Sequence, residues 1–298
     1  QKEEEIALSI QSDTQRHQGQ LSVPISAKGV LYYRLVAGDS TAGPFELTVQ
    51  DIPVVTIESV NYQPPAYTKL GSFPKSGGAI RAIDGTKIQI KATVNRPVKR
   101  ARIEFNPERV GKGIQATAGT TEPTIDSSGA QLSASFTLRS GSGVASNPEK
   151  DSYRIVVWDM IDQQNIDPII YPIEIIPDLP PEISITVPSQ TPKDLPLNAQ
   201  QTVEIHASDP DFGLSRIAIE IRYGNNQTLT PILWENPDGA LGHQVASIPI
   251  RPEELRLSIG DRVRIIGIAA DNRNDPDSDL VRPNIVRTDP IQLTITAP

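Results

Sequence analysis

Two acidic turns contain the residues whose types and spacing could do chemistry. The first lies in TVEIHASDPDFGLSRIAIEIRYG, residues 202–224, where Asp209, Asp211 and Gly213 separate two alternating apolar runs. The second, DNRNDPDSD, extends from Asp271 to Asp279. Ca²⁺ takes about 6 to 8 oxygen ligands, several of them carboxylate. The two turns could therefore share a calcium ion if the strands that carry them are neighbours.

The same residues also have a structural interpretation. Asp, Asn, Pro and Gly are the residues that tight turns require, and an Asp at the end of a strand often accepts hydrogen bonds from the amides of the next turn. The equivalent turn in the middle of the chain is NRPVKR, residues 95–100, which is basic and cannot bind calcium. A position that tolerates either charge is structural, so we predict no metal site and no tight calcium site in these turns.

Other residue types that serve in catalysis or metal binding are not arranged for it. His17, His206 and His243 are far apart in the sequence and no pair has metal-ligand spacing, so each is expected on the solvated surface. The stretches KSGG (75–78) and SGSG (140–143) lack the rest of a phosphate-binding loop, and no Gly-x-Ser-x-Gly motif occurs. We therefore predict no catalytic residue and no cofactor, so that the protein is not an enzyme.

Two tryptophans are the candidates for a sugar-stacking platform, which needs exposed aromatic rings. Trp158 lies in an apolar strand and is expected in the core. The sequence does not decide whether Trp234 is buried or exposed, so a sugar-binding role for this residue stays open.

Composition limits the partners. The 28 basic and 36 acidic residues give a net charge of −8, which argues against nucleic acid because phosphate binding needs a basic face. There are no cysteines and 27 prolines. Disulfides are therefore excluded, and the prolines favour loops and edge strands.

No apolar run approaches the roughly 20 residues that span a bilayer, and no signal peptide is visible. Because the first residue is Gln1, we expect the chain to be a piece of a longer protein.

The apolar periodicity is that of β-strands. KIQIKATV (87–94), TVEIHAS (202–208) and IAIEIRY (217–223) alternate strictly between apolar and other residues, which is typical of strands with one buried face. The alternation predicts a shared core and leaves Glu220 on the solvated face. The predicted core residues are Val203, Ile205, Ala207, Ile217, Ile219 and Ile221.

Three segments repeat the same ending: YRLVAGD (33–39), YRIVVWD (153–159) and IIGIAAD (265–271). Short alternating strands in units of this length indicate an all-β fold of tandem immunoglobulin-like β-sandwiches. We expect the C-terminal half of such a domain at 1–52, a domain at 53–177 and another at 178–298. Tyr33 and Tyr153 lie at the start of the repeated strand, and we expect the hydroxyl of each to form a hydrogen bond with the backbone. The third unit has Ile265 at this position and must close its corner differently.

The first segment is expected to be incomplete. Strands at 5–11, 20–26, 30–38 and 45–50 match the second half of the third unit, with nothing before them to match its first half. An uncovered apolar face would then include Val23, Ile25, Tyr33 and Leu35, and unpaired edges invite association. We predict docking of this segment on the middle domain or self-association.

Longer motifs carry a resemblance to a known family. They include the stretch YYRLVAGDSTAGPFELTVQDIPVVTIESVNYQPPAYTKL, then DGTKIQIKATVNRPVKRA, PDLPPEISI and ASDPDFGLSRIAIEIRY. In order and over nearly its whole length, the chain resembles the extracytoplasmic part of large membrane-anchored proteins of unknown function from planctomycete-type bacteria. The resemblance implies tandem immunoglobulin-like domains in a periplasmic or extracellular position, tethered by membrane segments outside this chain. It supplies no catalytic residues.

Taken together, these patterns favour a non-enzymatic structural or interaction module that acts as a spacer or a protein-binding surface. The expected partners are other envelope proteins or a second copy of the chain, with no nucleic acid and no membrane contact by this segment itself. The alternative is a carbohydrate-binding or adhesive module, assisted by calcium. An exposed row of aromatic rings, or a filled metal site between Asp209, Asp211 and Asp271, would distinguish it.

Overall fold

The computed structural model describes residues 5–11, 16–21, 29–111, 113–140, 148–224, 227–274 and 282–298. The chain forms two compact units, Gln1–Pro53 and Val54–Pro298. Within the described residues the only helical segment is the short 3-10 turn η1, Ala66–Thr68. No helix among them has the length and apolar character needed to cross a membrane.

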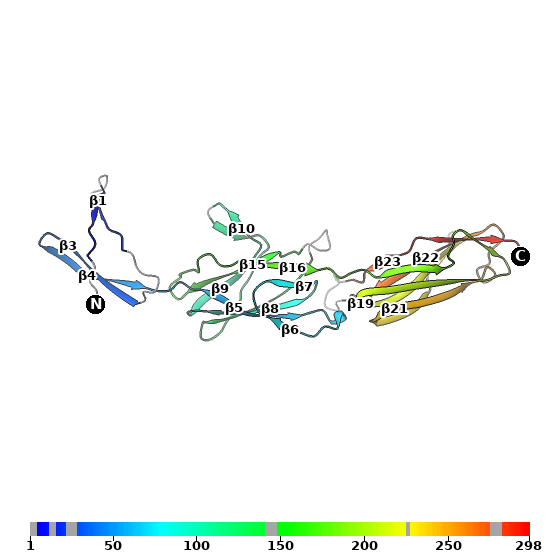
Figure 1. Ribbon diagram of the computed structural model, residues 1–298, viewed down its shortest axis with the longest axis horizontal. Helices are drawn as coiled ribbons and strands as arrows, with labels where there is room; N and C mark the ends of the chain where they lie inside the picture. Colours follow the sequence, from blue (N-terminus) through cyan, green and yellow to red (C-terminus); the bar gives the residue numbers. More distant parts are fainter. Residues whose placement is uncertain are drawn as a thin grey trace. The chain divides into compact units, whose positions relative to one another are not determined.

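In its described residues, the first unit contains two antiparallel hairpins (Figure 1). One pairs β1 (Ser9–Gln11) with β2 (Arg16–Gln18), and the other pairs β3 (Gly29–Ala37) with β4 (Ser40–Val49). In the second hairpin Tyr33 and Leu35 are 47% and 44% exposed, as predicted for an uncovered apolar face. Val23, Ile25 and most of the strand expected at 20–26 lie outside the described residues. The incomplete-domain interpretation stays a prediction.

The second unit begins with a sandwich of two five-stranded sheets, visible in Figure 1 as the strands from β5 to β16. The sheet orders are β12-β9-β15-β16-β7 and β13-β14-β8-β5-β6, and only the β16–β7 pair is parallel. The strands of these two sheets are β5 (Val55–Gln63), β6 (Phe73–Lys75), β7 (Ile80–Ile83), β8 (Lys87–Val94), β9 (Val98–Phe105), β12 (Thr120–Thr121), β13 (Thr124–Ile125), β14 (Gln131–Thr137), β15 (Ser152–Asp159) and β16 (Tyr171–Ile176). We call this the middle sandwich. Strands β10 (Pro107–Val110) and β11 (Gly113–Ala116) form a separate antiparallel hairpin.

Sequence alternation explains how the middle sandwich closes. In β8, Ile88, Ile90, Ala92 and Val94 are buried, whereas the residues between them are half-buried or exposed. The buried set packs against the inner faces of β9, β14 and β15 in one continuous core. Two sheets that bury one face each against the other give this kind of sandwich.

A second sandwich follows, which we call the C-terminal sandwich. Its sheet order is β17-β19-β22-β24-β18, with β20 and β21 paired to β19 and β23 paired to β22. The strands are β17 (Glu182–Val187), β18 (Lys193–Pro196), β19 (Gln201–Tyr223), β20 (Gln227–Leu229), β21 (Ile232–Ile250), β22 (Arg262–Asp271), β23 (Ile285–Arg287) and β24 (Ile291–Thr296). Its core contains all six residues that the alternation predicts, so that prediction is confirmed: Val203, Ile205, Ala207, Ile217, Ile219 and Ile221.

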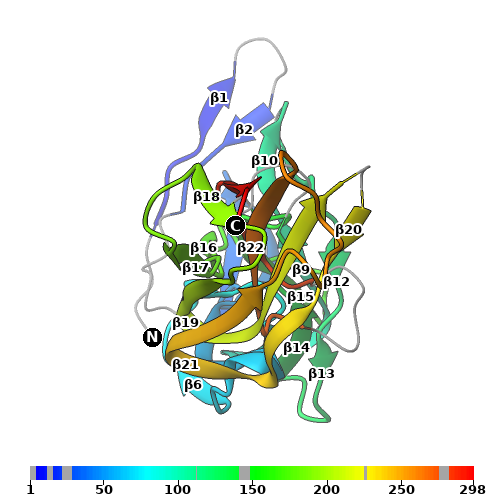
Figure 2. The ribbon, with the colours of Figure 1, turned by 90° about the vertical axis from the view of Figure 1, so that its right-hand side faces the viewer.

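The acidic turn at Asp209 differs from the expected corner between two strands. The chain continues through it as one 23-residue strand, β19. Its first half pairs with β17 and its second half with β22, while β21 pairs with both halves and runs alongside β19 in Figure 2. The ladder is irregular between Asp209 and Leu214, where Gly213 has a φ of +124°. Only glycine adopts this backbone readily, so the turn is a bend that takes one strand from one layer of the sandwich to the other.

Candidate functional site at the junction of the two sandwiches

Asp209 organises the bend in β19. Its side chain is nearly buried, and its Oδ1 accepts hydrogen bonds from the backbone N–H groups of Asp211, Phe212 and Gly213 at 3.2, 2.8 and 2.8 Å. This is the structural role that the sequence predicts for an Asp in such a turn. Its second oxygen, Oδ2, is buried and has no hydrogen-bond partner.

The aspartates that end the repeated strands have the same role. Asp271, which ends β22, accepts the N–H groups of Arg273 and Asn284 at Oδ1, at 3.1 and 2.9 Å. Asp159, which ends β15, accepts the N–H groups of Ile161 and Gln163 at 3.0 and 2.8 Å. Both carboxylates are buried, so the repeat marks a turn-closing position in both sandwiches.

The structure brings the two acidic turns together and adds residues that sequence reasoning missed. Asn284 donates its side-chain N–H groups to Asp271 Oδ2 at 2.8 Å and to Asp178 Oδ1 at 3.1 Å. Asp178 belongs to the Pro-rich linker between β16 and β17, and it accepts the hydroxyl of Tyr67 at 2.6 Å. Tyr67 comes from the PPAYT stretch, whose composition gave no sign of a role at a junction.

Further bonds cross directly from the middle to the C-terminal sandwich. The side-chain amide of Asn272 donates to the backbone oxygen of Tyr67 at 3.0 Å, and Lys69 Nζ donates to the backbone oxygen of Gly239 at 3.0 Å. Arg273 forms an ion pair with Asp84, at the turn between β7 and β8, with an Nη2–Oδ2 distance of 2.9 Å. We call this set of contacts the junction.

The linker and an aromatic pair complete the junction. The backbone N–H of Leu179 donates to Asp211 Oδ2 at 2.9 Å, which attaches the linker to the bend in β19. The rings of Tyr67 and Phe212 meet edge to face with centroids 5.8 Å apart. Such aromatic pairs favour offset or edge-to-face geometry, so the junction combines apolar and polar contacts.

Three aspartates of the junction, Asp178, Asp211 and Asp271, have raised pKa values. Burial raises the pKa of Asp178 to about 6, and the nearby charge of Asp271 adds to this, although the hydrogen bond from Tyr67 opposes it. Burial also raises the pKa of Asp211 to about 6, assisted by the neighbouring carboxylate of Asp209. The pKa of Asp271 is raised mainly by burial and further by the charge of Asp209. Asp178 and Asp211 are therefore expected to change protonation state near pH 6.

The junction does not present a formed metal cage. In the parts of the chain that the structure describes, no three or more His, Cys, Asp or Glu side chains are grouped so as to hold a metal ion. Most junction carboxylate oxygens instead accept hydrogen bonds, as given above. Asp275, Asp277 and Asp279 of the second acidic stretch lie outside the described residues. The absence of a tight calcium site stays a prediction.

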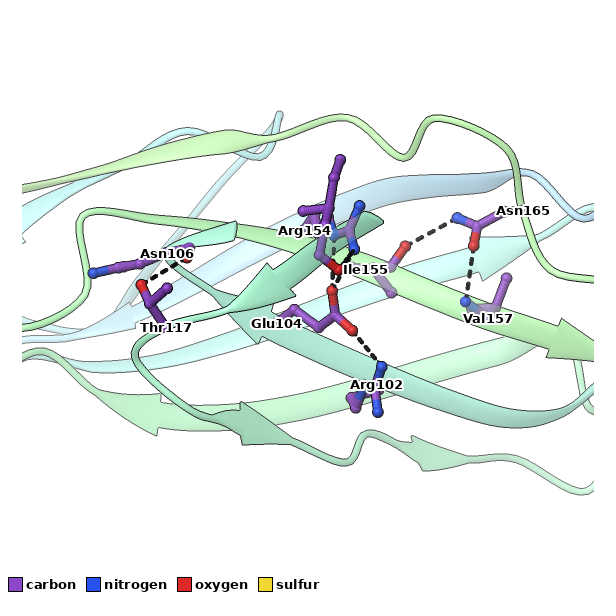
Figure 3. A network of polar contacts seen from close by, with 9 residues as sticks. Arg102, Glu104, Asn106, Thr117, Arg154, Ile155, Val157 and Asn165 are labelled. Atoms are coloured by element: carbon purple, nitrogen blue, oxygen red, sulfur yellow. Dashed lines mark hydrogen bonds and ion pairs between the residues drawn. The ribbon is translucent and has the colours of Figure 1, made fainter. Parts of the chain in front are cut away.

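A separate network of buried charge lies in the middle sandwich (Figure 3). Arg154 Nε donates to Glu104 Oε2 at 2.8 Å, both side chains are nearly buried, and Arg102 pairs with the other oxygen of Glu104. Arg154 also reaches the backbone oxygen of Ile114 in β11 at 3.4 Å. Asn165 bridges the backbone of Ile155 and Val157 at 2.9 and 3.0 Å. The network therefore connects β9 to β15 and ties Asn165 to the backbone of β15.

Two expectations about single residues in the sheets are wrong. Trp158 is half-buried on the outer face, where Arg100 and Arg102 cover its ring at 4.1 and 5.3 Å, so it is not a core residue. The strand alternates there, and Val157 takes the core position. Glu220 is 7% exposed instead of solvated, because Arg222 and Arg287 both bind its carboxylate.

Other predicted residues have mixed outcomes. The hydroxyl of Tyr153 ties back to the backbone as predicted, donating to the oxygen of Gly78 at 2.7 Å, although Gly78 lies far upstream. Trp234 is half-buried against the C-terminal core and is not an open platform. His206 and His243, which the sequence separates, contact each other. His17 is exposed in β2 of the first unit.

No protein-family model matches the sequence, and no curated protein matches it. Among solved structures, a marsupial T cell receptor is similar, with 9% sequence identity, coverage of 74% of this chain and 71% of that chain, and a TM-score of 0.26. The sheet orders and paired cores described above define the fold class. The chain is an all-β protein built of immunoglobulin-like β-sandwiches.

Proposed function

We propose that the chain is a non-enzymatic extracytoplasmic module of a membrane-anchored protein, in which the sandwiches act as a spacer and a protein-binding surface. The observation that supports it best is the junction. Side chains of the middle sandwich bond to the C-terminal sandwich, and both bond to the linker. A spacer needs such fixed connections, because a flexible linker cannot keep its ends at one separation.

Energetics support a semi-rigid connection. A typical intramolecular hydrogen bond contributes about 0.5–1.5 kcal/mol, so several bonds together with an aromatic contact can oppose the entropy of free rotation about the linker. Residues 177–181, PDLPP, are rich in proline, which limits backbone freedom further. The linker is therefore restrained by its own composition and by its bond to Asp211.

Amide hydrogen exchange at Leu179 tests the restrained linker. We expect slow exchange of its N–H in the wild-type protein and fast exchange in Asp211→Ala, which removes the acceptor. Asp238→Ala is the matched control, because Asp238 is an exposed aspartate on β21. It should leave the exchange rate of the Leu179 N–H unchanged. The proposal of a spacer would be contradicted if the Leu179 N–H of the wild-type protein exchanged as fast as that of an unstructured peptide.

The location is tested in cells that carry the longer protein. A protease-sensitive tag can replace the exposed turn at Ser127 and Ser128. In spheroplasts, added protease should cleave the tag of an extracytoplasmic module. A tag that survives until the membrane is permeabilised would place the module inside and contradict the proposal.

A calcium-assisted adhesive or carbohydrate-binding module is the second candidate. Asp178, Asp211 and Asp271 all take part in the junction, although no three such carboxylates of the described residues form a metal-binding group. The two candidates differ in their response to calcium, which the spacer does not need and the adhesive module does.

A further inference from the structure

Two histidines meet on the outer face of the C-terminal sandwich. In the β19–β21 ladder His206 is opposite Val245 and His243 is opposite Ser208, so the histidines are diagonal neighbours on one face. Nδ1 of His206 lies 2.7 Å from Nε2 of His243, and the ring centroids are 4.9 Å apart. The other face of the same part of β19 holds the buried residues Val203, Ile205 and Ala207, which fix the direction of His206.

Glu204 orients the first histidine. Its Oε1 lies 2.7 Å from Nε2 of His206 and also accepts the hydroxyl of Thr186, on β17, at 3.2 Å. When Nε2 of His206 donates its proton to Glu204, the lone pair of Nδ1 points at His243.

A metal-ligating histidine usually has this arrangement, with one ring nitrogen on the metal and the other donating to a carboxylate. Imidazole nitrogens suit Zn²⁺, Ni²⁺ and Cu²⁺. We propose that His206 and His243 form a surface site for a divalent transition-metal ion, with Glu204 as a positioning residue and water completing the coordination. The ion takes the place of the proton between Nδ1 of His206 and Nε2 of His243, and that proton moves through solvent to Nδ1 of His243, so that both imidazoles stay neutral.

The geometry needs only a small adjustment. Metal–nitrogen bonds of about 2.0–2.1 Å at a tetrahedral angle place the two nitrogens about 3.3 Å apart, so the rings must separate by roughly 0.6 Å. Both side chains lie at the surface, where His243 is exposed and the His206 side chain is 28% exposed. Side-chain rotation can therefore supply the movement.

The surrounding ladder positions suit a cation. On the same face, Glu182 and Ser184 of β17 lie opposite Ser208 and His206. None of these positions carries a lysine or arginine that would repel the ion. Two protein nitrogens are fewer ligands than a closed structural site uses, so the bound ion exchanges with solvent and keeps open positions.

Zinc calorimetry on the full chain near pH 7.5 tests the site. We expect one zinc ion per chain, with binding lost in His206→Ala and in His243→Ala. His17→Ala is the matched control, since its imidazole is in the other unit, and it should bind as the wild type does. Glu204→Gln should weaken binding about 10- to 100-fold, the usual effect of removing an outer carboxylate. Mg²⁺, which prefers oxygen ligands, should give no heat.

A spectroscopic readout separates this site from any other. Cu²⁺ added at one equivalent should give an electron paramagnetic resonance spectrum with coupling to two nitrogens, and each histidine variant should lose that pattern. Circular dichroism confirms that the surface variants are folded. Wild-type zinc binding that survives in His206→Ala, no zinc binding at all, or a copper spectrum without two nitrogens would overturn the proposal.

Discussion

At the scale of single residues, strand alternation determines which side chains are buried and therefore contribute most to the stability of the fold. Ile219 is fully buried in the C-terminal core. Ile219→Ala should cost roughly 2–5 kcal/mol, the usual loss for a large-to-small change in a core. Urea unfolding measures it, and a loss near that of an exposed substitution would show that the register of β19 is wrong.

Glu220 gives a second residue-scale prediction that differs from the sequence-based one. Its carboxylate is nearly buried and binds Arg222 and Arg287, and both pairs lower its pKa. Removing it leaves two arginines without their partner, so Glu220→Ala should lower the urea midpoint by more than Glu58→Ala, at an exposed position of β5. Equal midpoints for the two variants would contradict a stabilising role of these two ion pairs.

Asp178 makes stability depend on pH in a defined direction. Its pKa in the folded protein is about 6, above the value near 4 of an unfolded Asp. Between these values the folded protein holds a proton that the unfolded chain has lost, so this group adds stability as the pH falls from about 6 to about 4. Asp211 acts in the same direction, whereas Glu204 and Glu220, with lowered pKa values, act in the opposite direction at lower pH.

Asp178→Asn removes the titrating group and keeps an oxygen that can accept the Tyr67 hydroxyl, while the bond from Asn284 is lost at every pH. Between pH 7 and pH 5 the free energy of unfolding should rise by more in the wild type than in the variant. Urea unfolding at several pH values gives both profiles. Parallel profiles would mean that Asp178 is not protonated in this range.

At the scale of elements, the acidic bend of β19 should not need calcium. The Oδ1 atom of Asp209 is used by three backbone amides, and Asp178 and Asp271 are bridged by Asn284. We predict that melts with calcium and with chelator coincide and that calorimetry detects no tight binding. A rise of several degrees with calcium would contradict this, since a ligand of the native state must stabilise it, and would favour the adhesive candidate.

Elements were predictable where local pattern decides them. The strict alternation of residues 202–208 and 217–223 identifies both halves of β19 and their core residues. It cannot show that the halves form one strand, because this depends on β21 pairing across the bend. The strand-ending Asp159 and Asp271 were predictable as turn-closing residues from their repeated position.

The site was less predictable, because it depends on contacts distant in sequence. Asn272 and Tyr67 are 205 residues apart, and the diagonal contact of His206 with His243 depends on the register of two long strands. Trp158 and Glu220 were assigned to the wrong environments for a related reason. Neighbouring arginines cover both side chains, and hydrophobic alternation contains no information about such partners.

At the scale of the whole molecule, the exposed apolar residues of the first unit should affect association. The β3–β4 hairpin leaves several large apolar side chains exposed, among them Tyr32 at 67% and Val36 at 64%, and apolar surface of this kind promotes association. Sedimentation should detect more self-association in the full chain than in residues 54–298. Equal association of the two would contradict this role of the hairpin.

The central claim is that the junction holds the two sandwiches of the second unit in one relative orientation. Because the chain has no cysteine, Ser135→Cys and Thr202→Cys, at exposed positions of β14 and β19, introduce two unique sites for spin labels. Asn272→Ala removes a buried amide that bridges the sandwiches, and Asn165→Ala removes one that lies within the middle sandwich. Pulsed electron–electron double resonance should give one narrow distance distribution for the doubly labelled chain, both alone and with the added Asn165→Ala substitution. With the added Asn272→Ala substitution the distribution should be broad. A broad distribution without either Asn substitution would contradict the claim.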